Sequence, residues 1–173
     1  QVKVYDVQAD GDCLFHCVRK VLDDLNIEVS IKDLRAIVAR SIGDKELTML
    51  KYIYTFAEIQ KEEELLWDYA FMKNVKTVYQ LRQAVMTRHY FGDEMALRAI
   101  ERAYPVKFMV IRMLENNRIE LSRRCSEEEV NDKPWFSLLL LNMRAVHYEL
   151  ISYQGKSVMR REELPAKIQR LMK

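Results

Sequence analysis

The chain has 173 residues, 49% of them hydrophobic and 31% charged, which is enough for one well-packed globular domain spanning residues 1–173. Its net charge of +2 comes from 28 basic and 26 acidic residues that are dispersed among each other, which argues against a nucleic-acid-binding surface. No apolar run approaches the roughly 20 residues of a membrane-spanning helix, and four glycines and three prolines argue against long disordered linkers.

The first part of the chain predicts helices after one short strand. Alternating β-branched residues predict a strand over 2–7, and a turn at 9–12 precedes a helical pattern from 13 to about 25. Ser30, answered by Asp33 in the first turn, is typical of a helix N-cap. Further helices are expected within 45–72, over about 75–87, and from Glu94 to Ala103 behind an Asp93 cap.

Strands dominate after Pro105. They are expected at Val106–Met113, Arg118–Leu121, Phe136–Asn142 and Val146–Tyr153, with a hairpin turn at Asn116-Asn117 and a closing helix over 161–171. Because the helices come early and the strands late, we predict an α+β fold with a small, mostly antiparallel sheet flanked by a helical lobe.

The chain has three cysteines, Cys13, Cys17 and Cys125. An odd number without framework spacing argues against a disulfide-stapled secreted domain and favours a reducing compartment, so we expect a cytoplasmic protein. No signal peptide is visible in the N-terminal residues. Cys17 falls near the apolar stripe of the first helix and is assigned to the core.

Cys13 is the candidate nucleophile because it lies at the first turn of a helix, directly after Gly11 and Asp12. The positive end of the helix dipole favours its thiolate. The unpaired amides of the turn can bind an oxyanion, and Gly11 permits a close backbone approach or a positive φ. A free cysteine is more often a small core residue, so this position needs a second catalytic group.

His147, in the last expected strand, is the candidate base. A nucleophilic thiol needs a group that accepts its proton and later protonates the leaving amine, and histidine titrates near neutral pH. Glu149 shares a strand face with His147 by the two-residue period. Asn142 comes close to His147 if residues 143–146 form a hairpin turn. Either side chain could orient the imidazole, and we favour Asn142.

A structural metal site is the rival interpretation of the same cysteine. Cys13, His16 and Cys17 have helical spacing, with His89 or Cys125 as a fourth ligand. Because Cys17 turns toward the core and there is no CxxC pair, we expect no metal and no other cofactor. His16 is then expected at the surface and His89 in a structural role.

Three blocks of the sequence resemble the OTU (ovarian tumour) family of cysteine deubiquitinases. The segment Asp10–Phe15 is similar to the family's D-G-[ND]-C-L-F signature. Phe91–Glu94 is similar to its W-G-[DG]-x-x-E/L segment, with Phe91 in place of Trp, and His147-Tyr148 matches its terminal H-Y element. The blocks occur in the family's order and span residues 5–153.

The resemblance implies a papain-like fold that hydrolyses isopeptide bonds at the C-terminus of ubiquitin, or of a ubiquitin-like protein, through a thioester on Cys13 with His147 as base. Asp10 matches the family's acidic position at the oxyanion loop, and the amides of Asp12 and Cys13 are the expected oxyanion donors. The third catalytic residue varies in the family, which leaves Asn142 and Glu149 open. The compact size and the bare first strand look most like viral OTU domains, which would act in the host cytoplasm and in evasion of host immunity.

The expected partner is ubiquitin or polyubiquitin, bound by a monomer that contacts neither nucleic acid nor membrane. The arginines in ubiquitin's tail need acidic acceptors, for which Glu94, Glu149 and Asp12 are the candidates. Aromatic residues of the helical lobe could contact the apolar patch of ubiquitin, although packing within the lobe is the favoured interpretation for each. They are Tyr52, Tyr54, Phe56, Trp67 and Phe71.

Two other functions stay open at this point. One is a non-catalytic module that binds ubiquitin without cutting it, and the other is a papain-like peptidase of ordinary peptides. The second shares the chemistry of the leading hypothesis and differs only in the substrate channel.

Overall fold

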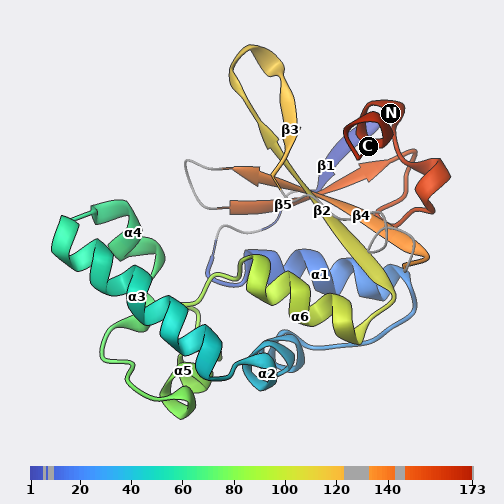
Figure 1. The fold of residues 1–173 in the computed structure, drawn as a ribbon. Coiled ribbons are helices and arrows are strands. Elements are labelled where there is room, and N and C mark those ends of the chain that lie inside the picture. Colours follow the sequence, from blue (N-terminus) through green and yellow to red (C-terminus); the bar gives the residue numbers. More distant parts are fainter. Residues whose placement is uncertain (6, 8–9, 123–132, 143–146, 173) are drawn as a thin grey trace.

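The computed structural model describes residues 1–5, 7, 10–122, 133–142 and 147–172 (Figure 1). Its helices are α1 (Cys13–Asp24), α2 (Ile31–Ser41), α3 (Asp44–Gln60), α4 (Glu63–Asp68), α5 (Val78–Val85), α6 (Glu94–Ala103) and α8 (Ala166–Leu171). Its strands are β1 (Val2–Tyr5), β2 (Val106–Met113), β3 (Ile119–Leu121), β4 (Trp135–Asn142) and β5 (His147–Tyr153). Short 3-10 helices occur at Ala70–Met72, Glu115–Asn117 and Arg161–Glu163.

The five strands form one sheet in the order β1-β5-β4-β2-β3. β2 and β4 run parallel, and the other neighbouring pairs are antiparallel. This arrangement confirms the predicted α+β fold with a mostly antiparallel sheet. Helices α1 and α6 lie on one face of the sheet, and α8 lies on the other face near the two chain termini (Figure 1).

The alternation of side chains along the strands builds a separate core on each face of the sheet. In β2, Phe108 and Val110 join the large core formed with the early helices, whereas Met109 and Ile111 join a smaller core with Ile168 of α8. The large core therefore holds the start of α1 against the sheet.

Local signals in the sequence account for most element boundaries. Ser30 and Asp33 form the capping box expected at α2, and Asp93 accepts hydrogen bonds from the first amides of α6. Asn116 and Asn117 have φ angles of 62° and 59°, which suit the hairpin turn between β2 and β3.

The predicted closing helix over 161–171 is wrong in its first part. A short 3-10 helix ends at Glu163, and α8 begins only at Ala166. Pro165 disfavours helical geometry at the residue before it, and Leu164 is indeed extended, with a ψ of 149°. No helix in the described part of the chain is long and apolar enough to cross a membrane.

Candidate active site

The thiol of Cys13 lies at the start of α1 and is 1% exposed. Burial raises its pKa, because the anion loses its hydration, and the carboxylate of Asp10 raises it further. Backbone hydrogen bonding from Tyr148 and Leu14 lowers the pKa but does not outweigh burial. Burial therefore outweighs the backbone contributions in the free protein, and the expected effect of the helix dipole stays a prediction.

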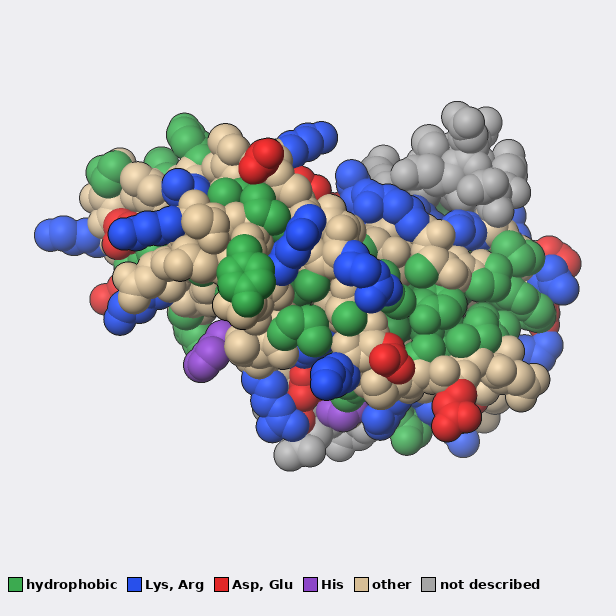
Figure 2. Space-filling model, turned by 90° about the horizontal axis from the view of Figure 1, so that it is seen from below, with side chains coloured by type: hydrophobic (Ala, Val, Ile, Leu, Met, Phe, Trp, Pro, Cys, Tyr) green, Lys and Arg blue, Asp and Glu red, His purple; other side chains and the backbone are tan. Residues whose placement is uncertain are grey.

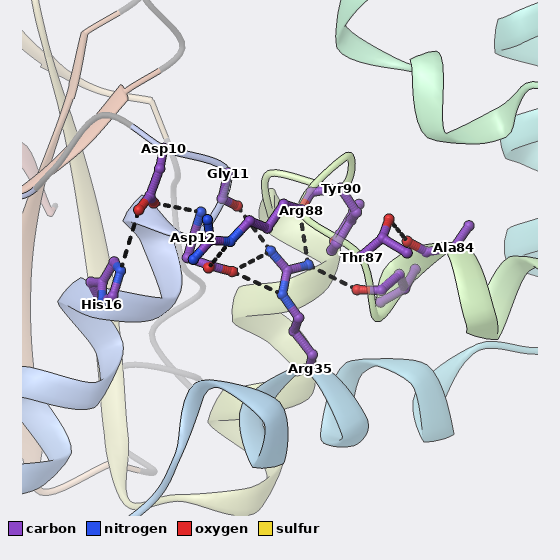
Figure 3. A network of polar contacts seen from close by, with 10 residues as sticks. Asp10, Gly11, Asp12, His16, Arg35, Ala84, Thr87, Arg88 and Tyr90 are labelled. Carbon is purple, nitrogen blue, oxygen red and sulfur yellow. Dashed lines mark hydrogen bonds and ion pairs between the residues drawn. The ribbon is translucent and has the colours of Figure 1, made fainter.

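The loop before Cys13 is folded back on itself by Asp10 (Figure 3). Oδ1 of Asp10 accepts a hydrogen bond from the backbone N–H of Asp12 at 2.8 Å, and the Asp10 carbonyl accepts one from the N–H of Cys13 at 3.3 Å. Oδ2 of Asp10 lies 3.7 Å from Nε2 of His16. In the free protein the amides of Asp12 and Cys13 both donate within the loop, so their role as oxyanion donors stays a prediction.

Asp12 is buried and binds two arginines (Figure 3). Its Oδ1 accepts hydrogen bonds from Nε and Nη2 of Arg35, at 3.1 and 2.7 Å, and its Oδ2 accepts one from Nε of Arg88 at 2.9 Å. Burial alone would raise the pKa of Asp12, but Arg35 and Arg88 together outweigh burial and lower it. The sequence analysis did not single out Arg35, whose side chain the structure buries on α2.

The three acidic residues expected to accept hydrogen bonds from the arginines of ubiquitin differ in burial and in their present partners. Asp12 is wrong as an acceptor because Arg35 and Arg88 already occupy both of its oxygens. Glu94 is exposed and pairs with Arg98 one turn further along α6. Glu149 is half-buried in β5, and its role stays a prediction.

Two glycines bring the first two sequence blocks into contact. A Cβ on Gly11 would lie 2.1 Å from the carbonyl oxygen of Arg88, so the backbone approaches closely there, as one of the two expected roles of this glycine requires. Gly92 has a φ of 86°, and a Cβ on it would lie 2.7 Å from Cδ2 of Leu14. Phe91, which replaces the family's tryptophan, packs edge-on against Trp67 with ring centroids 5.3 Å apart.

His147 is the first residue of β5 and is 9% exposed. It pairs directly with Asn142 of β4, which agrees with the expected proximity of these two positions. The Asn142 side chain and the predicted turn at 143–146 lie outside the described residues, so their roles stay predictions. The buried Nδ1 of His147 has no hydrogen-bond partner among the described groups. The carboxylate of Glu149 therefore does not bind it.

The thiol and the imidazole approach each other through Tyr148. Helix α1 packs on β5, the backbone of Tyr148 contacts the Cys13 thiol, and the Cys17 thiol donates to the Tyr148 carbonyl at 3.6 Å. His147 is the next residue along the strand. Although the structure describes both side chains, it contains no hydrogen bond between the Cys13 thiol and the His147 imidazole. The structure therefore brings the two segments together without closing the catalytic pair.

The strand alternation explains why this pair is open. Tyr148 and Leu150 belong to the large core on the α1 side of the sheet, whereas Ile151 belongs to the smaller core on the other side. His147 and Glu149 share the strand face of Ile151 by the two-residue period. This assignment of faces agrees with the absence of a hydrogen bond between the imidazole and the thiol.

The rival metal site is not assembled. Cys17 is fully buried in the large core, as expected, and burial raises its pKa. His89 is exposed, and Cys125 lies outside the described residues. Within the described ranges, the only cluster of His, Cys, Asp and Glu ligand atoms within 4.8 Å is Asp10, Asp12 and His16. The arginines on Asp12 already neutralise that cluster.

The aromatic residues of the helical lobe differ in exposure. Phe71 is buried at 7% and Tyr54 is partly buried, as the packing interpretation predicted. Tyr52 and Phe56 are 75% and 47% exposed, so the interpretation is wrong for these two, whereas Trp67 is 58% exposed but packs against Phe91. Figure 2 shows exposed hydrophobic side chains interspersed with lysine and arginine on this side of the molecule.

No protein-family profile and no curated protein matches the chain. Its fold is similar to that of an ovarian tumour (OTU) domain solved in complex with ubiquitin, with a TM-score of 0.57 and 19% identity over 98% of this chain and 80% of that one. It is also similar to an OTU deubiquitinase from Wolbachia pipientis wMel bound to ubiquitin, with a TM-score of 0.55 and 16% identity over 90% of this chain and 98% of that one. The chain therefore has the papain-like α+β fold of OTU domains.

Proposed function

We propose that the chain is an OTU-family cysteine deubiquitinase that cleaves isopeptide bonds at the C-terminus of ubiquitin, with Cys13 as nucleophile and His147 as base. The observation that carries this proposal is the position of Cys13. In an OTU fold, the cysteine of the D-G-D-C-L-F segment starts the central helix and touches the strand that begins with His147. The cytoplasmic location and the viral source stay predictions from the sequence.

The proposed reaction is acyl transfer. The Cys13 thiol passes its proton to His147, and Sγ attacks the carbonyl carbon of ubiquitin's last glycine. The tetrahedral intermediate collapses when the leaving lysine amine takes the proton from His147, which leaves a thioester on Cys13. Water then gives a proton to the same imidazole and attacks the thioester, releasing the ubiquitin carboxylate and restoring the thiol.

This cycle depends on a change in the position of the imidazole. Because burial keeps the Cys13 thiol protonated at neutral pH, a base has to remove the proton during the reaction. Catalytic hydrogen bonds are often long in free enzymes and tighten when substrate binds. We infer that the bound ubiquitin tail brings the His147 imidazole within reach of the thiol.

A ubiquitin-binding module without activity is the second candidate. The observation that favours it is the absence of a hydrogen bond between Cys13 and His147, both of which belong to the described residues. The two candidates make the same prediction for ubiquitin binding and opposite predictions for turnover.

Hydrolysis of ubiquitin carrying a fluorogenic C-terminal amide separates these functions. We expect turnover in the wild type and a fall of roughly 10³-fold or more in Cys13→Ala. Cys17→Ala removes a thiol one helical turn away and is the matched control, with activity within about threefold of the wild type. Binding without hydrolysis would select the module, and cleavage of a short tail peptide but not of ubiquitin would select the general peptidase.

A further inference from the structure

Arg35 is buried beneath the loop that carries Cys13 (Figure 3). Its side chain is 3% exposed, and its guanidinium donates five hydrogen bonds, which is every N–H that the group has. Two go to Oδ1 of Asp12 and one to the Gly11 carbonyl at 2.9 Å. The remaining two go to the carbonyls of Val85 and Tyr90, at 2.8 and 2.9 Å. One side chain thus ties the nucleophile loop to α2, α5 and the segment before α6.

Asp12 differs from the residues that cap α2, α5 and α6. Ser30, Thr77 and Asp93 each accept hydrogen bonds from the first amides of the helix that follows. Asp12 is an equally good capping residue, yet its side chain makes no cap hydrogen bond to α1. Its carboxylate is turned to Arg35 instead. The first turn of α1 is therefore left without the side-chain cap that α2, α5 and α6 have.

The same guanidinium also holds the residue on the far side of the cysteine. The Arg35 guanidinium carbon lies 4.4 Å from the centre of the Phe15 ring, which is a stacking contact. Arg35 thereby contacts Gly11 and Asp12 before Cys13 and Phe15 after it. The backbone groups of Tyr148 and Leu14 lie close enough to lower the pKa of the Cys13 thiol, so its surroundings depend on how the neighbouring residues are fixed.

We propose that Arg35 is a positioning residue for the Cys13 thiol and acts through Asp12 and Gly11. The planar guanidinium of arginine can donate hydrogen bonds to Asp12 and to three backbone carbonyls at the same time, which the ammonium group of lysine cannot do. A buried ion pair is weak support for stability as such, because well-packed apolar residues often replace it without loss. The contacts of Arg35 converge on the nucleophile loop, so its main effect falls on the reactivity of Cys13. The kinetic part of this inference rests on the proposed function.

Arg35→Lys tests the inference, with two measurements on the folded variant. We expect kcat for ubiquitin amide hydrolysis to fall roughly 10–100-fold with KM nearly unchanged, because a misplaced thiol affects the chemical step. We also expect the rate and the pH dependence of Cys13 alkylation by iodoacetamide, followed by mass spectrometry of the Cys13 peptide, to change.

Arg82→Lys is the matched control. The Arg82 guanidinium also donates two hydrogen bonds to a backbone carbonyl, that of Ile42, at 3.2 and 2.7 Å. It makes no contact with the nucleophile loop among the described interactions. Arg82→Lys should lower the thermal midpoint while leaving kcat and Cys13 alkylation as in the wild type.

The inference is overturned if Arg35→Lys behaves like this control, with a lower thermal midpoint but wild-type alkylation of Cys13. Asp12→Asn keeps the shape of the side chain and provides a second variant if Arg35→Lys does not fold. Asp12→Asn should also change the rate and the pH dependence of Cys13 alkylation, as Arg35→Lys does. Unchanged alkylation would equally reject the inference. If wild-type protein does not hydrolyse ubiquitin, the proposed function fails, whereas the alkylation comparison still decides the role of Arg35.

Discussion

The two sides of the candidate site are organised in opposite ways. On the side of Cys13, Asp12 has two arginine partners, and every N–H of the Arg35 guanidinium is used. On the side of His147, the buried Nδ1 has no hydrogen-bond partner among the described groups. Among the described residues, hydrogen bonds therefore fix the loop of the nucleophile, whereas none of them orients Nδ1 of the base.

The difference has a physical origin in the chain. The nucleophile loop is enclosed by segments from α1, α2, α5 and the start of α6, and a buried carboxylate among them has to be paired to be stable. His147 is the first residue of a strand, at the end of the sheet where β4 and β5 finish their pairing. The imidazole is buried there, yet none of the described groups orients its Nδ1 through a hydrogen bond.

His147→Ala is the largest expected change in activity. We expect ubiquitin hydrolysis to fall about 10²–10⁴-fold, which is the usual contribution of a general base. Alkylation of Cys13 in the free protein should stay near the wild-type rate, because no hydrogen bond joins the thiol to the imidazole. A parallel fall in alkylation would show that the two groups are already coupled, and the contrast between the two sides would disappear.

Gly11→Ala is expected to displace the loop that precedes Cys13. The added Cβ would lie 2.1 Å from the backbone oxygen of Arg88, so the loop or its neighbour has to move. We expect a loss of about 1–3 kcal/mol of unfolding free energy in urea denaturation, and a fall of roughly 10²-fold in kcat from the displaced thiol. Gly43→Ala, where a Cβ would meet nothing within 4 Å, is the control. Equal activity of the two variants would contradict a rigid nucleophile loop.

Substitutions at Asn142 and Glu149 test which residue orients the imidazole of His147. Asn142 lies directly opposite His147 in the strand register, so we expect Asn142→Ala to lower kcat roughly tenfold or more by misorienting the imidazole. Glu149→Gln should have a smaller effect, since the Glu149 carboxylate makes no hydrogen bond to Nδ1 of His147. Steady-state kinetics on ubiquitin amide measure both. The opposite order would make Glu149 the orienting residue.

The pH dependence of stability isolates the Asp12 ion pairs and is the smallest expected effect. The pKa of Asp12 is lower in the folded protein than in the unfolded chain, so its stabilisation is present above the unfolded value of about 3.9 and is lost as the pH falls through the folded value. Asp12→Asn should cost about 1–3 kcal/mol at pH 7, and less below pH 4, in urea denaturation.

Asp93→Asn provides the comparison of opposite sign. Burial raises the pKa of Asp93, so its ionisation costs stability as the pH rises from the unfolded value through the folded one. The free-energy difference between wild type and Asp93→Asn should therefore shrink as the pH rises. A pH-independent difference for Asp12→Asn would show that its ion pairs do not contribute to stability.

Local signals made much of the fold predictable from the sequence. The caps at Ser30 and Asp93 and the asparagine turn at Asn116-Asn117 involve residues only a few positions apart, and the structure confirms them. Strand alternation likewise predicted β2, β4 and β5 to within one residue. These features depend on short-range geometry that a single sequence displays.

The organisation of the site was less predictable because it depends on distant contacts. Arg35 binds Asp12, which is 23 positions away in the sequence, and Tyr90, which is 55 positions away. No local sequence pattern predicts such pairs. The helical pattern also does not reveal that Asp10 accepts hydrogen bonds from the amides of Asp12 and Cys13 in the free protein. The raised pKa of Cys13 likewise follows from the depth of burial, which the sequence does not state.

Covalent capture by a ubiquitin probe with a C-terminal electrophile tests the central claim most directly. We predict that intact mass spectrometry shows one ubiquitin added to the wild type and to Cys17→Ala, with the adduct mapped to Cys13, and none added to Cys13→Ala. Ubiquitin that binds but leaves Cys13 unmodified, or an adduct on another cysteine, would contradict the account.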